Sequence, residues 1–213
     1  MDLDALKEYT RKYWTEAKDT HVADPAYYRL AETELRAIVE RHLPRGGNVL
    51  DVGCGNGEYT VLLAERAGRL LAFDISDSLL EAARKRCAGF DNVSFFLANL
   101  ATTRVAFSHQ VDAVFCMGVF ACLPDDAQLL RVLDDFADYL VDGGLLVLRD
   151  STVRGLQQYV QYPSGHLGYY RNKAALLETL RQKGFDLTEE IPLKAEIEPF
   201  NDYFVLHRHA RKD

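Results

Sequence analysis

A glycine-rich stretch that follows an apolar run is the part of the sequence best suited to holding a ligand. It reads Val49-Leu-Asp-Val-Gly-Cys-Gly-Asn-Gly-Glu-Tyr59. Glycines let the chain turn sharply and let a ligand lie against bare backbone. In an open α/β sheet, the turn after the first strand is a usual binding place. We therefore expect a ligand beside Gly53 and Gly55, with Asp51 ordering the turn or accepting hydrogen bonds from a cationic ligand.

The spacing of these glycines excludes two phosphate-binding motifs. A dinucleotide-binding turn has the pattern G-x-G-x-x-G. Counted from Gly53, the third glycine position holds Glu58, and counted from Gly55 it holds Thr60. The Gly-Lys-Ser/Thr ending of a phosphate-binding P-loop is also missing, and an acid in the turn repels phosphate. The turn favours a ligand with a positive centre and no phosphate.

A second acidic residue, Asp74, ends the next apolar run, Leu70–Phe73. An acid about 20 positions beyond a glycine turn, at the end of the second strand, is placed to bind ribose hydroxyls. An isolated acid at a strand end is an ordinary loop residue. Its register with the glycine turn makes the ligand interpretation of Asp74 the better one.

Apolar runs alternate with helix-like stretches over most of the chain, and these elements must position the turn. Continuous apolar runs suit strands that are covered on both faces of a parallel sheet. Such alternation implies right-handed crossovers and a doubly wound α/β sheet. The expected strands are 48–52, 69–73, 93–97, 111–116 and 144–149, and the expected helices between them are 58–67, 77–88 and 125–140, the last ended by Gly143 and Gly144.

The two ends of the chain differ from this pattern. Residues 1–43 are expected to form an N-terminal helical segment with helices over 3–17 and 26–42, and residues 44–213 the ligand-binding domain. The two parts make a single structural domain overall. Near the C-terminus we expect a glycine- and aromatic-rich loop, a helix over 171–183 and a hairpin-like pair of strands. That pair covers 185–191 and 203–209, with the last strand antiparallel to the others.

Composition limits the classes of function. The 213 residues carry a formal net charge of −7, and 48% are hydrophobic, which is ordinary for a soluble enzyme. No apolar stretch suits a membrane span and the charged first twenty residues do not suit a secretory signal, so we expect a complete, cytoplasmic chain. The acidic balance disfavours a nucleic-acid partner. The four cysteines and six histidines show no metal-ligand spacing, so no metal site is expected.

Five segments together resemble a known family. They are VLDVGCGNGEYT, LLAFDIS, Phe96–Leu100, Val111–Asp125 and Asp142–Leu148. In this order and spacing they are similar to class I S-adenosylmethionine (SAM)-dependent methyltransferases over about residues 45–150. The resemblance implies a mostly parallel, seven-stranded, Rossmann-like sheet with an antiparallel last strand and an N-terminal helical lid. It also implies SAM as cofactor and S-adenosylhomocysteine (SAH) as product.

The resemblance assigns cofactor contacts at both ends of SAM. Asp74 would bind the ribose, Ile75 would pack on the adenine, Asn99 would bond the adenine amino group, and the Leu100 N–H would face a ring nitrogen. An amide replaces the commoner acid at Asn99, and its oxygen still accepts a hydrogen bond. The methionine part of SAM would lie among Asp51, Gly53, Cys54 and Gly55, with Met117 nearby. The Cys116 carbonyl would accept a hydrogen bond from its amino group, and Arg29 would pair with its carboxylate.

The acceptor side has three candidate catalytic residues. Transfer from a sulfonium is an in-line displacement in which alignment supplies most of the catalysis, and a base matters when the acceptor arrives protonated. Asp150 follows the fifth strand and is a base or a strand-end cap. His166 lies in the loop 161–171 and is a base or a solvent-facing residue. Tyr28 closes on the methyl donor or packs its helix. The loop tyrosines either line the pocket or pack the loop.

The resulting hypothesis is a methyltransferase that acts on a nitrogen or oxygen nucleophile of a small molecule. Its partners would be a small-molecule acceptor, with no nucleic acid and no membrane, and the protein would be a monomer or homodimer. Two alternatives stay open, a protein or peptide amine methyltransferase and a SAM-binding protein without transfer activity. A nucleotide-dependent oxidoreductase fails on the glycine spacing.

Overall fold

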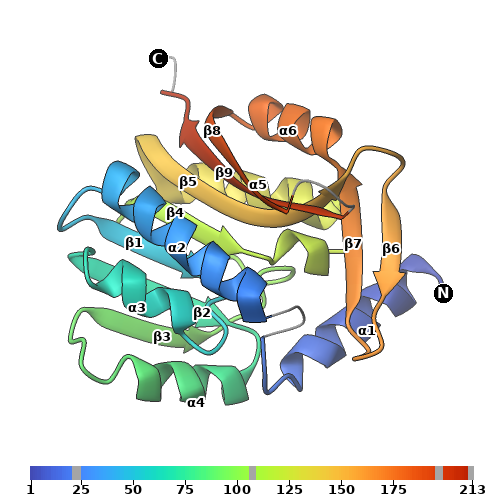
Figure 1. Ribbon diagram of the computed structural model, residues 1–213, viewed down its shortest axis with the longest axis horizontal. Helices are drawn as coiled ribbons and strands as arrows, with labels where there is room; N and C mark the ends of the chain where they lie inside the picture. The colour runs from blue at the N-terminus through green and yellow to red at the C-terminus, as the bar shows by residue number, and fades with distance from the viewer. Residues whose placement is uncertain (21–24, 106–108, 195–198, 211–213) are drawn as a thin grey trace.

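One mixed sheet with helices on both faces makes up the fold (Figure 1). The structure is a computed structural model that describes residues 1–20, 25–105, 109–194 and 199–210. Its helices are α1 (Leu3–Thr15), α2 (Pro25–His42), α3 (Glu58–Ala64), α4 (Asp77–Arg86), α5 (Asp126–Tyr139), α6 (Lys173–Gln182) and the 3-10 turn η1 (Phe120–Cys122). Its strands are β1 (Asn48–Val52), β2 (Arg69–Asp74), β3 (Val93–Leu97), β4 (Val111–Met117), β5 (Leu140–Val153), β6 (Gln158–Gln161), β7 (Leu167–Asn172), β8 (Phe185–Lys194) and β9 (Phe200–Arg208).

The strand order confirms the doubly wound prediction. Strands β3, β2, β1, β4 and β5 lie side by side and pair in parallel. On the far side of β5, β9 pairs antiparallel with it and with β8, as expected for the last strand. Because β1 stands where the strand order reverses, the glycine turn after β1 opens at the topological switch point of the sheet.

The sheet has nine strands among the described residues instead of the expected seven, because β6 and β7 were not expected. The segment predicted as a loop is a hairpin, in which Tyr159 pairs with Tyr169 and their rings stack at 4.5 Å. Gly165, at φ +87°, makes the turn between the two strands. Alternate tyrosines pack well on a pleated ribbon, which explains why this aromatic segment is a hairpin and not a loop.

The end of α5 also differs from the prediction. The helix ends at Tyr139, and β5 begins directly at Leu140 and not at Gly144. Leu140 already pairs with Val111, and a shift of register follows before Ala113 pairs with Leu145. Gly143 and Gly144 therefore lie inside an irregular strand and do not end the helix. Helix starts follow the sequence more closely, since Ser76 caps α4 by accepting from the Leu79 N–H.

Two apolar layers, one on each face of the sheet, show to which face each strand side chain points. Helices α2 and α3 cover one face, where they pack on Leu145 and Val147 of β5. Helices α5 and α6 cover the other face, where they pack on Leu146 and Leu148. Because successive strand residues point to opposite faces, the next two residues of β5, Arg149 and Asp150, point to different sides of the sheet.

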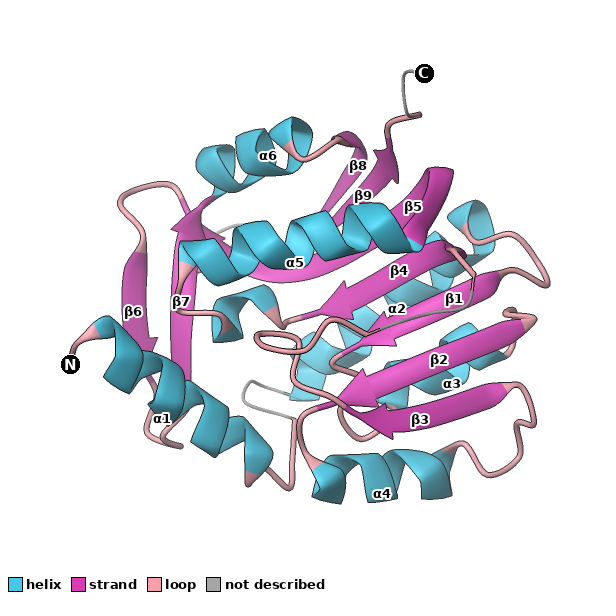
Figure 2. Ribbon diagram, turned by 180° about the vertical axis from the view of Figure 1, so that it is seen from behind, coloured by secondary structure: helices cyan, strands magenta, loops and turns pink. Residues whose placement is uncertain are grey.

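Helix α1 lies across the carboxyl ends of the strands, between the β6–β7 hairpin and α4 (Figure 2). The Tyr9 hydroxyl donates to the Gly165 carbonyl in the hairpin turn at 2.7 Å. At the far end of the segment, the Ser76 hydroxyl donates to the Ala17 carbonyl at 2.9 Å. Among the described residues, no helix has the length and apolar character needed to cross a membrane.

Candidate functional site

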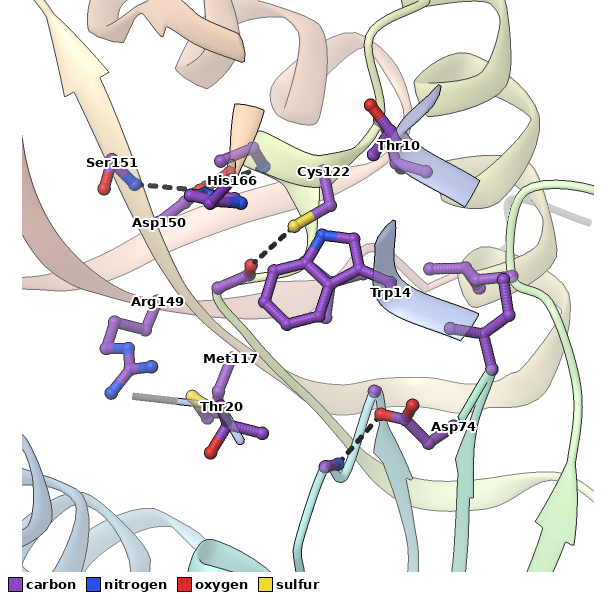
Figure 3. A pocket seen from close by; sticks show the side chains of 18 of the residues that line it. Thr10, Trp14, Thr20, Asp74, Met117, Cys122, Arg149, Asp150, Ser151 and His166 are labelled. Carbon is purple, nitrogen blue, oxygen red and sulfur yellow. Dashed lines mark hydrogen bonds between the residues drawn. The ribbon is translucent and has the colours of Figure 1, made fainter. Parts of the chain in front are cut away.

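A cavity of about 990 Å³ lies at the carboxyl ends of β1, β2, β4 and β5 (Figure 3). Residues of α1, the hairpin and the first turn of α2 also line it, so α1 closes one side. Its volume lies at the upper end of the range for small-molecule sites. Its position matches the crevice where open α/β sheets bind ligands.

The glycine turn forms one wall of the cavity through bare backbone. The Gly53 and Cys54 N–H groups both donate to the Phe73 carbonyl, at 2.9 and 3.0 Å, which folds the turn against β2. Gly53, Gly55 and Gly57 have φ values of +67°, +55° and +80°, a region that other residues rarely adopt. A Cβ at Gly57 would stand 2.9 Å from the Ala83 Cα of α4. The turn thus requires glycine for both conformation and space.

Two buried carboxyl groups frame this turn. Asp51 is 2% exposed and accepts from the Thr60 hydroxyl at 2.7 Å, and its burial raises its pKa to about 7. Asp74 accepts from the Gly55 N–H through one oxygen and from the Ser76 N–H through the other, each at 2.9 Å. Burial also raises the pKa of Asp74. A cation beside these groups would relieve the cost of their burial.

Ile75, Asn99 and Leu100 line the same cavity beside Asp74. The Asn99 side-chain oxygen accepts from the Ala101 N–H at 2.9 Å, which fixes the loop after β3. Sequence reasoning missed two polar atoms of the cavity. The Thr10 hydroxyl and the Gln128 side-chain oxygen are buried without a hydrogen-bond partner among the described residues, and both residues line the cavity. Buried polar atoms of this kind are usually satisfied, so a bound ligand is their natural partner.

The structure brings Asp150 and His166 to the opposite end of the cavity. Asp150, 4% exposed, accepts from the Ser151 N–H at 2.8 Å and from the Ala121 N–H at 3.2 Å. Its burial raises its pKa to about 7, although these bonds and the cations Arg171 and Arg149 oppose the rise.

His166 is 5% exposed, which rules out the solvent-facing alternative. Its ring packs against Tyr13, Trp14 and Tyr162 at centroid distances of 5.8, 5.3 and 5.6 Å. Burial lowers the pKa of His166 to about 4, so the ring is neutral at physiological pH. Its Nδ1 is buried and has no hydrogen-bond partner among the described residues.

Some of the other site residues expected from the sequence line the cavity, and others do not. Tyr28, Gly53, Cys54, Gly55 and Met117 line the cavity. Cys116 is buried beneath it and does not line it. Arg29 is exposed on α2 and does not reach it.

Arg149 lines the cavity, as do Lys7 and Arg11 of α1, and sequence reasoning missed it. The signal was present, because a charged residue directly after a buried strand run faces the binding edge of the sheet. Trp14 of α1, which sequence reasoning also missed, lines the cavity as well.

Residues 49–144 match the family model described as "Methyltransferase domain". Trans-aconitate 2-methyltransferase of Rhizobium rhizogenes is 38% identical over 109 residues, which cover 50% of this chain and 40% of that protein. The dTDP-3-amino-3,6-dideoxy-alpha-D-glucopyranose N,N-dimethyltransferase of Streptomyces fradiae is 30% identical over 123 residues, covering 57% and 46%. The matched segment is a class I SAM-dependent methyltransferase domain.

Solved structures extend the likeness of the methyltransferase fold to nearly the whole chain. A complex of DhpI with SAH has a TM-score of 0.70 at 24% identity and covers 98% of this chain and 97% of that one. The N-methyltransferase NodS of Bradyrhizobium japonicum, with SAH, has a TM-score of 0.73 at 16% identity, covering 95% and 98%. The chain aligns with less than half the length of both curated relatives named above.

The cavity is lined both by residues inside the matched segment and by residues outside it. The turn from Asp51 to Gly55, with Asp74, Asn99 and Met117, lies inside the matched segment. Trp14, Arg149, Asp150 and His166 lie outside it. These four groups are therefore contributions to the cavity that the family model does not cover.

Proposed function

We propose that this protein transfers a methyl group from SAM to a nitrogen or oxygen nucleophile of a small molecule. One observation carries the proposal. The acidic glycine turn of a methyltransferase domain opens into the same cavity as two buried titratable groups, Asp150 and His166. A SAM-binding protein without transfer activity would have no need of the second pair.

The residues at the turn fit SAM in charge and in shape. SAM, when bound, supplies a methyl group on a positively charged sulfur. Asp51 and Asp74 carry buried carboxyl groups, and Asp74 retains lone pairs for ribose hydroxyls beyond the two it uses on Gly55 and Ser76. The Ile75 side chain would pack on the adenine, while Asn99 and the Leu100 N–H would bond its edge.

Asp150 and His166 are proposed as base or orienter for the acceptor. The Asp150 pKa of about 7 leaves this group half-ionised near neutral pH, where it can accept a proton from an ammonium or hydroxyl nucleophile. His166 is neutral at this pH and can accept a hydrogen bond. Both groups are screened from water, which keeps a nucleophile between them desolvated.

Residues 1–43 are proposed to act as a lid over this cavity. α1 is joined to the rest of the fold by a few polar contacts, among them Tyr9 with Gly165 and the ion pair of Lys7 with Asp125 at 2.8 Å. Release of these contacts would open the side of the cavity next to Trp14 and Tyr28. Segments held by few contacts are the ones that open first.

A small molecule is the preferred acceptor class. The relatives named above act, by their names, on trans-aconitate and on a dTDP-linked amino sugar. The enclosed end of the cavity, beneath α1 and the hairpin, suits a compact acceptor better than a peptide chain. An amine of a protein or peptide stays the alternative, and it would need α1 displaced.

The proposal is tested by steady-state transfer from labelled SAM to a panel of small amines, alcohols and acids. For the best acceptor, we expect kcat/KM of the wild-type protein to rise with pH through about 7. Asp150→Asn should abolish that rise, whereas His166→Ala should lower the rate and keep the pH dependence. Asp77→Asn, on the surface of α4, is the matched control. Unchanged turnover in both site variants would remove both residues from the mechanism.

A further inference from the structure

Arg149 is a buried cation without an acidic partner among the described residues. It is 8% exposed, and no carboxylate of the described residues lies within 4.0 Å of its guanidinium. Its Nη1 donates to the Tyr59 hydroxyl at 2.6 Å, while its Nε is buried without a hydrogen-bond partner. An unpaired buried charge is costly, so such a group is normally retained for a ligand.

Aromatic rings hold this guanidinium in place. It lies over the rings of Tyr59, Tyr27 and Tyr28, at 5.0, 5.7 and 5.9 Å from their centroids. Cation–π contacts of this kind stabilise the positive charge without neutralising it. Neighbouring tyrosine hydroxyls raise the pKa of Arg149 despite its burial, so the residue stays charged. Tyr203 also lies beside it, and its hydroxyl donates to the Ala31 carbonyl.

The guanidinium is open to the cavity. Arg149 lines the cavity, as does Gly118, whose missing side chain leaves space before the Nη2 atom. A Cβ at Gly118 would stand 3.4 Å from that nitrogen. In Figure 3 the Arg149 side chain lies beside Met117, apart from Trp14 and His166.

The position of Arg149 in the sheet favours the acceptor over the cofactor. β5 is the second strand from β1, so the Arg149 backbone stands roughly 10 Å across the sheet from the end of β1, and its side chain extends to Tyr59 in the first turn of α3. A series of hydrogen-bonded polar side chains continues the wall of the cavity from Arg149 toward β9. Tyr27 donates to the Asn201 side-chain oxygen, and the Asn201 amide donates to the Ser151 hydroxyl at 2.7 Å. These residues line the cavity on the side away from β2 and β3.

We propose that Arg149 binds a carboxylate of the methyl acceptor, so that the acceptor is an organic acid. This inference rests on the proposed transfer function and specifies its substrate class. The planar guanidinium fork matches a carboxylate in two parallel hydrogen bonds, and its Nε has no hydrogen-bond partner among the described residues. The rings of Tyr28 and Tyr59 flank the proposed carboxylate site, and Asn201 and Ser151 offer further polar contacts to the acid.

The experiment is calorimetric titration of the SAH-loaded protein with glutarate and phenylacetate and with the matched amides glutaramide and phenylacetamide. For at least one pair, we expect the wild-type protein to bind the acid about 10- to 100-fold more tightly than the amide. Arg149→Met should abolish that preference, and Arg149→Lys should restore part of it. Arg84→Met, a surface change on α4, should leave it intact. Equal binding of acid and amide by the wild-type protein would overturn the inference.

A second arm separates the acceptor from the carboxylate of SAM itself. Arg149→Met should bind SAH and its decarboxylated analogue with the same ratio of affinities as the wild-type protein. A selective loss for SAH would assign Arg149 to the cofactor and overturn the inference. If the wild-type protein failed to bind SAH at all, the proposed function would fail instead, which is a separate outcome. Circular dichroism of each variant checks that it is folded.

Discussion

Replacing Gly57 with alanine should destabilise the protein strongly, because this residue holds the glycine turn against α4. Its φ of +80° lies in the left-handed region, which costs about 1–2 kcal/mol for a residue with a Cβ. The new Cβ would also stand 2.9 Å from the Ala83 Cα and 3.0 Å from the Ala83 Cβ. Overpacking against such a neighbour costs about 1–3 kcal/mol. The two terms together amount to about 2–5 kcal/mol.

Thermal melting measures this cost directly. For a chain of this size, about 1 kcal/mol lowers Tm by 2–4 °C, so Gly57→Ala should melt about 4–20 °C below the wild-type protein. The stabilisation of this variant by SAH should also shrink, since the displaced turn carries the Gly55 N–H that holds Asp74. Gly89→Ala is the control, because nothing lies within 4 Å of its new Cβ and its φ is ordinary. If both variants melted within about 1 °C of each other, the reasoning on the turn would be refuted.

Two further predictions concern the acceptor side and the lid. Burial raises the pKa of Asp150 from 3.8 to about 7, so the folded state keeps a proton that the unfolded state loses, and this residue reduces stability as pH rises between these values. The Tm of Asp150→Asn should therefore fall less than that of the wild-type protein between about pH 4 and 7. Equal slopes of Tm against pH in the two proteins would contradict the raised pKa of Asp150. Tyr9→Phe removes the bond from α1 to Gly165, worth about 1 kcal/mol, and should speed hydrogen exchange of the α1 amides several-fold. Unchanged exchange would argue against a lid held by this contact.

The inner parallel strands were predictable from the sequence because they are buried on both faces, and the half-buried to exposed edge strand β3 was predictable from its apolar composition. The continuous apolar runs at 48–52 and 93–97 match β1 and β3 residue for residue. The β6–β7 hairpin was not predictable in the same way. Its tyrosines and glycines have no continuous apolar run, and its register depends on pairing between β7 and the end of β5. The boundary at Leu140 escaped prediction because its pairing with Val111 is a long-range contact.

The same distinction applies to the site. The glycine turn and Asp74 are local signals, since spacing along the chain brings them to the same edge of the sheet. Arg149 also carries a local signal, as a charged residue directly after a buried strand run, whereas Trp14 belongs to a distant segment and becomes a cavity residue only through the packing of α1. His166 was identified by residue type, but its burial among aromatic rings depends on the hairpin and α1 together.

The central claim is that the glycine turn and Asp74 form a SAM site. Calorimetric titration with SAH, run on the wild-type protein and on Asp74→Asn, tests this claim most directly. The wild-type protein should bind one SAH per chain. The variant should bind about tenfold or more weakly, because a charge-assisted hydrogen bond to the ribose is lost. Absence of SAH binding by the wild-type protein, or equal affinity in the two proteins, would contradict the account.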